Sequence, residues 1–151
     1  MLIGLYRHSV DAKKRMRMPS KFKSTLGANF IITKGNNQNL FVFSNEQFSS
    51  LYEKMIALPL FDEEAQKPVR RFLSSAFEAE EDGQGRILLP KELISYAGID
   101  KSIVLVGVGN RVEIWAEEVW EKESNDSENS DFSILAKFGV WSCKNLNIFR
   151  F

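Results

Sequence analysis

The chain of 151 residues carries one charged turn twice, and this repetition restricts the folds that it can adopt. The segment "DAKKRMRMPSKF" begins at Asp11, and the similar segment "DGQGRILLPKEL" begins at Asp82. An arginine follows four residues after each aspartate, as Arg15 and Arg86, and a proline follows each arginine by four more. Self-similarity of this kind indicates a structural unit that occurs twice, so we expect the two turns on equivalent elements of one fold.

The residues around the turns predict the same order of elements in both copies. A strand precedes each turn, a proline opens a short helix after it, and a glycine ends that helix. A β-hairpin and a second helix complete each copy, and "SNEQ" predicts that Ser44 caps the second helix of the first copy. The predicted elements are strand 4–10, helix 19–26, strands 29–33 and 40–43 and a helix from 45, then strand 76–80, helix 90–97, strands 102–108 and 112–115 and a helix from 116.

This pattern predicts an α+β protein with a first copy at 1–58 and a second at 76–123. Between them, 59–75 is expected to form a connecting helix whose regular part starts near Pro68, because proline disrupts a helix interior. Residues 124–151 are expected to hold a polar linker of disordered type, a short helix and a tail. Neither copy is long enough to close a core alone. We therefore expect the copies to interlock around a pseudo-two-fold axis, with both turns on one face.

The cysteine content and the apolar runs limit the class of protein. The single cysteine, Cys143, permits no intrachain disulfide and no multi-cysteine zinc site, which fits a reducing compartment. The N-terminal segment does not have the pattern of a signal peptide, and no apolar run reaches membrane-spanning length. We expect a cytoplasmic protein without a membrane partner and without a cofactor.

A neutral total charge conceals a basic N-terminal segment. Residues 1–35 hold eight Lys and Arg against one acid, Asp11, for a net charge of +7, whereas 36–81 carry −4 and 82–151 carry −3. Local patches, not totals, set the field that a phosphate backbone meets. Such a run of charge is either a solvated surface or a nucleic-acid contact, and the charge alone leaves both interpretations open.

Enzyme chemistry fits these residues poorly. Two related aspartates could share a proton as in an aspartic-protease dyad, but an arginine near each carboxylate keeps it ionised. His8 and Cys143 lie far apart in the sequence, and the glycines of "GVGN" stand between two predicted strands. The sequence therefore predicts a protein that is not an enzyme.

Binding fits the turns better. An aspartate can pair with the arginine across a tight turn and accept its backbone N–H groups, and for Asp11 and Asp82 this purely structural role weighs as much as a functional one. An arginine held at a turn can reach guanine O6 and N7, while nearby lysines contact phosphates. The candidate DNA-binding residues are Arg15, Arg86, Lys13, Lys14, Arg17, Lys21, Lys23, Asp11, Asp82 and Gln84.

At this point the sequence resembles a known family. The segments "LIGLYRHSVDAKKRMRMPSKF", "DGQGRILLPKEL" and "VLVGVGNRVEIW" are similar to the MraZ family of bacterial transcriptional regulators, from Met1 to Trp120 and more weakly to Phe138. The resemblance implies the swapped-hairpin β-barrel of AbrB-like DNA-binding proteins, with two tandem copies in one chain and D-x-x-x-R segments that face double-stranded DNA. It further implies a nucleoid-associated ring homo-oligomer that binds direct repeats in the promoter of the division and cell-wall gene cluster, usually as a repressor, with no small-molecule substrate.

The chain departs from the family pattern at one turn. The family has glycine before the arginine, as Gly85 has it here, but the first turn has Lys14. A positive φ there would strain a lysine by about 1 kcal/mol, and a changed turn would re-aim Arg15. The tail beyond Phe138 aligns with nothing in the family.

Two other classes stay open. An antitoxin-type AbrB-like module would mainly neutralise a protein partner, although such proteins usually pair one copy with a long disordered tail. A ring-forming scaffold would assemble without any affinity for DNA, and the +7 segment argues mildly against it.

Overall fold

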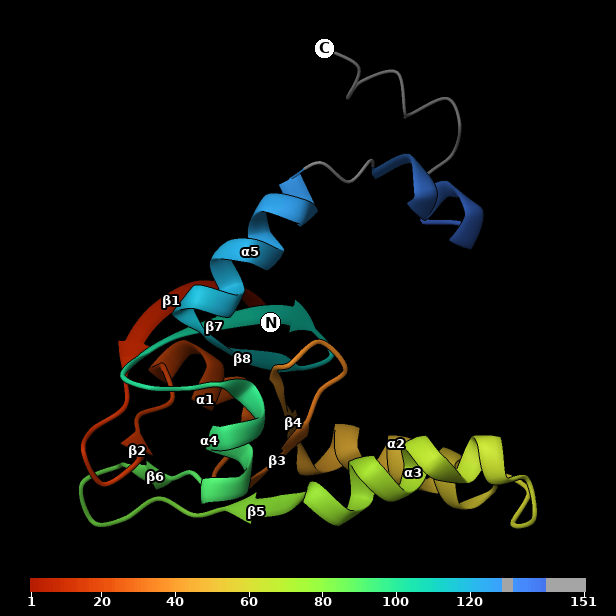
Figure 1. Cartoon of the computed structure of the whole chain (residues 1–151), viewed down its shortest axis with the longest axis horizontal. Helices are drawn as coiled ribbons and strands as arrows, with labels where there is room; N and C mark the ends of the chain where they lie inside the picture. Colours follow the sequence, from red (N-terminus) through yellow and green to blue (C-terminus); the bar gives the residue numbers. More distant parts are fainter. Residues whose placement is uncertain (129–131, 141–151) are drawn as a thin grey trace. The chain divides into compact units, whose positions relative to one another are not determined.

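A computed structural model describes residues 1–128 and 132–140 of the chain (Figure 1). The chain divides into two compact units, Met1–Trp120 and Glu121–Phe151. The first unit holds both turns and almost all of the regular structure. Among the described residues, no helix is both long enough and apolar enough to cross a membrane.

The same six elements occur in the same order on either side of helix α3 (Glu63–Ser75). Each half has a first strand, which is long in the first half and short in the second, then a two-residue strand after the charged turn, a short helix, a hairpin and a terminal helix. The first half is β1 (Leu2–Ser9), β2 (Arg15–Met16), α1 (Ser20–Leu26), β3 (Phe30–Lys34), β4 (Leu40–Ser44) and α2 (Asn45–Ile56). The second half is β5 (Phe77–Ala79), β6 (Ile87–Leu88), α4 (Lys91–Ala97), β7 (Ser102–Gly109), β8 (Val112–Ala116) and α5 (Glu117–Glu128).

The two halves share one antiparallel sheet. Its strand order is β1-β7-β8-β4-β3-β5, and the small strands β2 and β6 pair separately. The predicted hairpins β3–β4 and β7–β8 are confirmed. The first strand of each half pairs with the third strand of the other, β1 with β7 and β5 with β3. Neither half therefore completes its sheet alone, and the α+β class is confirmed.

The core lies where the sheet meets α1 and α4. Phe22 of α1 and Leu93 of α4 occupy equivalent places in the two halves, and both are buried. Phe22 also meets Tyr6 of β1 edge to face, with ring centroids 5.0 Å apart. Burying large side chains from both halves in one cluster favours the interlocked arrangement over two separate modules.

Helices α2 and α3 pack on each other and on the sheet beside β3 and β4 (Figure 1). The Phe48 ring of α2 stacks on the Phe72 ring of α3 at 6.0 Å, and both contact Phe43 of β4. The predicted cap is confirmed, because Ser44 accepts a hydrogen bond from the backbone N–H of Gln47. These rings hold the connecting segment against the first half.

Two boundary predictions were wrong. Pro68 lies inside α3 rather than at its start, because Asp62 caps the helix by accepting from Ala65 N and begins it earlier. Pro68 cannot donate to the carbonyl of Glu64, but the helix continues through it. Pro19 and Pro90 stand at the N-cap positions of α1 and α4, one residue before the first helical residue.

The C-terminal segment also differs from expectation. Helix α5 extends to Glu128, so residues 124–128 of the predicted linker are helical. A polar composition does not stop a helix that a preceding turn has already nucleated. The predicted short helix is the 3₁₀ helix Phe132–Phe138. Residues 129–131 and the tail from 141 lie outside the described residues.

Candidate nucleic-acid interface

Each charged turn is built by its aspartate. Asp11 accepts hydrogen bonds at Oδ1 from the backbone N–H groups of Lys13 and Arg15, both at 2.9 Å, and at Oδ2 from Arg15 Nε at 2.9 Å. Its own backbone N–H donates to the Arg15 carbonyl at 3.0 Å. The sequence pattern Asp-x-x-x-Arg therefore closes the turn through both the main chain and the side chains.

The second turn repeats this geometry. Asp82 accepts from the backbone N–H groups of Gln84 and Arg86 at 2.9 Å, and from Arg86 Nε at 3.0 Å. Its backbone N–H donates to the Arg86 carbonyl at 2.8 Å. Both aspartates therefore have the structural role of closing their turns.

The pairing of β2 with β6 brings the turns together. Arg15 lies opposite Leu88 and Met16 lies opposite Ile87. Arg15 Nη1 is 4.0 Å from the Asp82 carboxylate of the other turn. Two turns that are 71 positions apart in the chain therefore form one continuous surface.

Both aspartates are held in the ionised form. Hydrogen bonding from the backbone of Arg15 lowers the pKa of Asp11, and hydrogen bonding from the backbone of Arg86 lowers the pKa of Asp82. A proton-sharing dyad needs one of its two carboxyls to have a raised pKa. The two aspartates are therefore poorly suited to acid–base chemistry and well suited to holding the arginines in place.

Lys14 adopts the backbone conformation that the sequence comparison with Gly85 suggested. Its φ is +63°, and that of Gly85 is +75°. Lys14 N donates to the Asp11 carbonyl at 3.0 Å, just as Gly85 N donates to the Asp82 carbonyl at 3.1 Å. The lysine thus accepts the strained conformation, and Arg15 makes the same contacts with its aspartate as Arg86 does. The turn is therefore unchanged by the lysine, and the condition under which Arg15 would be re-aimed is not met.

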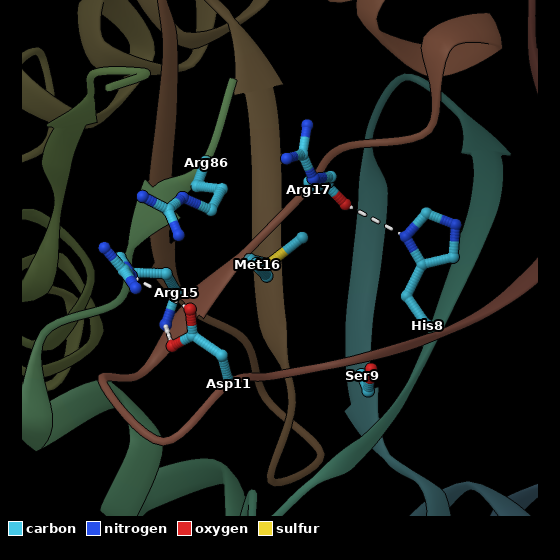
Figure 2. Close-up of a pocket in the computed structure, with 7 residues that line it drawn as sticks. All are labelled: His8, Ser9, Asp11, Arg15, Met16, Arg17 and Arg86. Carbon is cyan, nitrogen blue, oxygen red and sulfur yellow. Dashed lines mark hydrogen bonds and ion pairs between the residues drawn. The ribbon is translucent and has the colours of Figure 1, made fainter. Parts of the chain in front are cut away.

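A hollow of about 380 Å³ opens beside the first turn (Figure 2). It is lined by His8, Ser9, Asp11, Arg15, Met16, Arg17 and Arg86. In Figure 2, Arg86 of the second turn projects beside Arg15 on one side of the hollow. Three arginines from both halves thus border one opening, and each can meet an anionic ligand there.

His8 borders this hollow, which sequence reasoning did not anticipate. Its Nδ1 lies 3.0 Å from the carbonyl oxygen of Arg17. This contact joins β1 to the residues that follow β2. The sequence provided only its place in a predicted strand, and which face of that strand borders the hollow is known only from the tertiary structure.

The other predicted cations are distributed differently. Lys13 and Arg17 are exposed. A β-carbon placed on Gly85 would lie 3.5 Å from Arg17 Nη1, so Arg17 reaches the second turn. Lys23 donates to Glu81 at 2.6 Å, and Lys21 lines a separate hollow beside β1. The structure therefore groups Lys13, Lys14 and Arg17 with the two turn arginines. Lys23 lies at the edge of this group, because the Oε2 of its partner Glu81 is 3.9 Å from the same β-carbon position on Gly85, whereas Lys21 borders a separate hollow.

These features suit a protein that binds an anionic partner through surface arginines. Ionised aspartates orient two guanidinium groups, and exposed cations surround them. Within residues 1–128 and 132–140, no group of three or more His, Cys, Asp or Glu residues could hold a metal ion. The site is thus a cationic surface on paired turns.

Comparison with known proteins assigns the chain to a family. The family model described as "MraZ protein, putative antitoxin-like" matches the chain twice, over residues 1–71 and 72–137. "Transcriptional regulator MraZ" of Acetivibrio thermocellus is 45% identical over 140 residues, which are 93% of this chain and 98% of that protein. The protein of the same name from Clostridium tetani is 46% identical over 137 residues, 91% of this chain and 95% of that protein. The chain belongs to the MraZ family.

Proposed function

We propose that this protein is a sequence-specific DNA-binding transcriptional regulator. In this proposal it binds closely spaced direct repeats in its own promoter, at the head of the division and cell-wall gene cluster, and represses transcription from it. It acts in the cytoplasm, associated with the nucleoid, as a ring homo-oligomer. The relatives' shared name, transcriptional regulator, supports the general class.

The finer fold assignment belongs to the same proposal. We take 1–58 and 76–123 as two AbrB-like copies joined through 59–75, and the barrel as a swapped-hairpin type. The exchange of strands between the halves supports this, because β1 completes the sheet of the second half and β5 completes that of the first. The two separate matches of the family model support it as well.

The observation that carries the proposal is the pairing of the two turns with an arginine oriented in each. Arg15 Nε and Arg86 Nε are turned to their aspartates at 2.9 and 3.0 Å. The terminal guanidinium nitrogens are then the ones that would meet guanine O6 and N7. Lys13, Lys14 and Arg17 would supply phosphate contacts that do not depend on sequence.

Exposed apolar side chains support self-association. In the connection between α2 and α3, Leu60 is 74% exposed and Phe61 is 95% exposed, and Ile3 on the edge strand β1 is 63% exposed. Adjacent large apolar side chains that one chain leaves uncovered are typical of protein–protein contacts. A ring would present many turn pairs to repeated DNA boxes and increase affinity through effective concentration.

Fluorescence anisotropy tests the proposal. The full chain is titrated into a duplex from upstream of its own gene and into a scrambled duplex of equal length, across a series of salt concentrations. We expect a large preference for the upstream duplex that persists at each salt concentration. Equal and steeply salt-dependent binding to both duplexes would reduce the site to a generic basic patch, and no binding to either would favour the scaffold.

Arginine variants test whether Arg15 and Arg86 determine sequence specificity while the surrounding cations supply affinity for any DNA. Arg15→Ala and Arg86→Ala should each weaken binding to the upstream duplex by about 1–3 kcal/mol and weaken binding to scrambled DNA much less. Arg7→Ala is the matched control, because Arg7 pairs with Glu117 at 3.0 Å and does not line the hollow. If both turn variants weakened all DNA equally, the specific contacts would lie elsewhere.

A further inference from the structure

We propose that the hollow beside the first turn binds a small sugar phosphate, free or as part of a mononucleotide, and that this ligand competes with DNA. The proposal rests on the DNA-binding function proposed above and adds a regulator of the same surface. The hollow breaks the symmetry of the two halves, its lining is cationic, and two of its arginines are already oriented by hydrogen bonds.

The lining of the hollow differs from the equivalent positions of the second half. The turn aspartate and the turn arginine occur in both halves, 71 positions apart. At the same spacing, three other lining residues have different counterparts: Ala79 for His8, Glu80 for Ser9 and Leu88 for Arg17. The strands support this correspondence, because β1 lies beside β7 as β5 lies beside β3. This side of the paired turns therefore has hydrogen-bonding and cationic groups where the repeat has apolar or acidic ones, which indicates a ligand of the first half.

The charge of the lining suits a phosphate group. Three arginines and one aspartate line the hollow, so its net charge is +2 when His8 is neutral. A phosphate monoester carries about −1.5 to −2 at pH 7. Arginine binds phosphate oxygens through two parallel N–H groups, and Arg15 and Arg86 reach the opening from different halves. One phosphate group between them would neutralise the lining.

The two turn arginines are oriented before any ligand binds. The side chains of Arg15 and Arg86 are only 24% and 23% exposed, and the Nε of each donates to its turn aspartate. Figure 2 shows both on one side of the hollow and His8 on the other. There, His8 Nδ1 donates to the carbonyl oxygen of Arg17 at 3.0 Å and holds its main chain against β1. Groups that are already held lose little conformational freedom when an anion binds.

The volume and the remaining polar groups define the ligand. The hollow measures about 380 Å³, near the lower end of the roughly 300–1,000 Å³ that is typical of small-molecule sites. Ser9 is exposed, and its hydroxyl can both donate and accept a hydrogen bond. The ionised Asp11 carboxylate only accepts, so it suits a sugar hydroxyl and repels a second phosphate. The lining therefore favours a sugar phosphate over an inorganic polyphosphate.

Ligand and DNA use the same guanidinium groups in this proposal. The terminal nitrogens of Arg15 and Arg86 are the proposed contacts to bases, and in the hollow the same atoms meet the phosphate. One guanidinium cannot satisfy both partners, so each partner lowers the affinity of the other by the same factor. At a ligand concentration of about ten times its Kd, the apparent Kd for the upstream duplex rises about tenfold.

Calorimetry and competition test the site with defined probes. The full chain is titrated with ribose 5-phosphate and with AMP, and with ribose and adenosine as the matched compounds without phosphate. We expect only the two phosphorylated probes to bind, and to weaken anisotropy-measured binding of the upstream duplex about tenfold at about ten times their Kd. The inference is overturned if neither phosphorylated probe binds or displaces DNA.

Sulfate is the control for a simple anion. Potassium sulfate replaces the probe at equal ionic strength, because protein–DNA affinity falls with salt whatever the ligand. We expect sulfate to weaken binding of the upstream duplex much less than AMP or ribose 5-phosphate does. An equal effect would mean an adventitious ion only, and the hollow would then not be a ligand site.

Two substitutions give the hollow the residue types of the second half. His8→Ala and Ser9→Glu match Ala79 and Glu80, and each should weaken the phosphorylated probes roughly tenfold. His8→Ala releases the main chain of Arg17, and Ser9→Glu repels the phosphate. Ser50→Glu adds the same charge at an exposed position of α2 and should leave probe binding unchanged. Unaltered probe binding by both hollow variants would place the ligand elsewhere and reject the site.

The outcomes separate this inference from the proposed function. If the unmodified chain prefers upstream DNA but binds neither phosphorylated probe, only the inference fails. If it shows no preference for upstream DNA, the proposed function and the competition fail together, and calorimetry still decides whether the hollow binds the probes. A thermal unfolding curve identifies any variant that does not fold, and Ser9→Glu should match the unmodified chain because Ser9 is exposed.

Discussion

Lys14 is a strained residue within the proposed DNA-binding surface. At φ +63° a lysine meets steric repulsion that glycine avoids, and Gly85 holds the equivalent place at φ +75°. The turn keeps its hydrogen bonds in spite of this, because Asp11 fixes it through three contacts. In the proposed function, a phosphate contact from Lys14 would offset this strain.

Lys14→Gly is therefore expected to stabilise the fold and weaken DNA binding. The free energy of unfolding should rise by about 1 kcal/mol, because the left-handed conformation becomes accessible without strain. The dependence of log affinity on log salt should become shallower by about 0.9, since one phosphate contact is lost. Urea denaturation and anisotropy across salt measure the two effects. The opposite change at the equivalent position of the second turn, Gly85→Ala, adds a side chain at a positive φ and should destabilise the fold. A stabilising Gly85→Ala would refute the strain argument.

The turn aspartates predict a dependence of stability on pH. Their folded-state pKa values are lowered, first by backbone hydrogen bonds from Arg15 and Arg86. Their contribution to stability is therefore present above about pH 4 and lost as the pH falls through the lowered values. The double variant Asp11→Asn, Asp82→Asn should melt at a lower temperature than the unmodified chain at neutral pH. The difference should shrink below pH 4 in circular dichroism melts.

The control for this experiment is Asp100→Asn, at an exposed position outside the turns. It should leave the difference in melting temperature close to zero at every pH. A double variant whose deficit stayed constant from neutral pH to strongly acidic pH would show that the turn carboxylates do not act through their charge.

At the scale of single elements, the caps of the helices were readable from sequence. Ser44 accepts from Gln47 N at 3.1 Å, and Gly27 and Gly98 end α1 and α4 with φ of +88° and +66°. These are local interactions between residues a few positions apart, so propensity and spacing predict them. Pro68 shows the limit of the same reasoning. Its helix begins earlier because the cap at Asp62 and the stacking of Phe72 on Phe48 outweigh the loss of one hydrogen bond.

Ser44→Ala tests the cap of α2. It should lower the free energy of unfolding by about 1 kcal/mol, because the backbone N–H of Gln47 loses its acceptor. Chemical denaturation monitored by circular dichroism measures the change. Ser50→Ala, at an exposed position in the interior of the same helix, should have little effect or stabilise slightly. Equal losses for the two variants would mean that the cap adds nothing.

At the scale of the whole molecule, the exposed connection between α2 and α3 tests the proposed ring. Phe61 is 95% exposed, so Phe61→Ser should change the unfolding free energy by less than about 0.5 kcal/mol. It should nevertheless lower the mass measured by light scattering, because an apolar contact between copies is lost. Ala28→Ser, at another exposed position, is the control. An unmodified chain with the mass of one copy, 17.3 kDa, at all concentrations would exclude a ring.

The sequence alone determined the repeat, the order of elements, the hairpins and the helix ends at Ser44, Gly27 and Gly98, and it raised the question of a positive φ at Lys14. Each depends on residues close in the chain, where hydrogen-bond geometry and sterics restrict the backbone. It also predicted that Arg15 and Arg86 pair with the aspartate four residues earlier in each turn, because that partner is local in the chain.

Only the tertiary structure decided which strands pair and which cations share a surface. The exchange of β1 and β5 between the halves depends on burying one core shared by both, which no local segment specifies. The pairing of β2 with β6 brings Arg17 beside Gly85, His8 borders the same hollow as the turn arginines, and the pairing of Lys23 with Glu81 joins residues 58 positions apart. The sequence shows eight Lys and Arg residues in one segment, and the tertiary structure shows which of them lie on the same surface as the turn arginines.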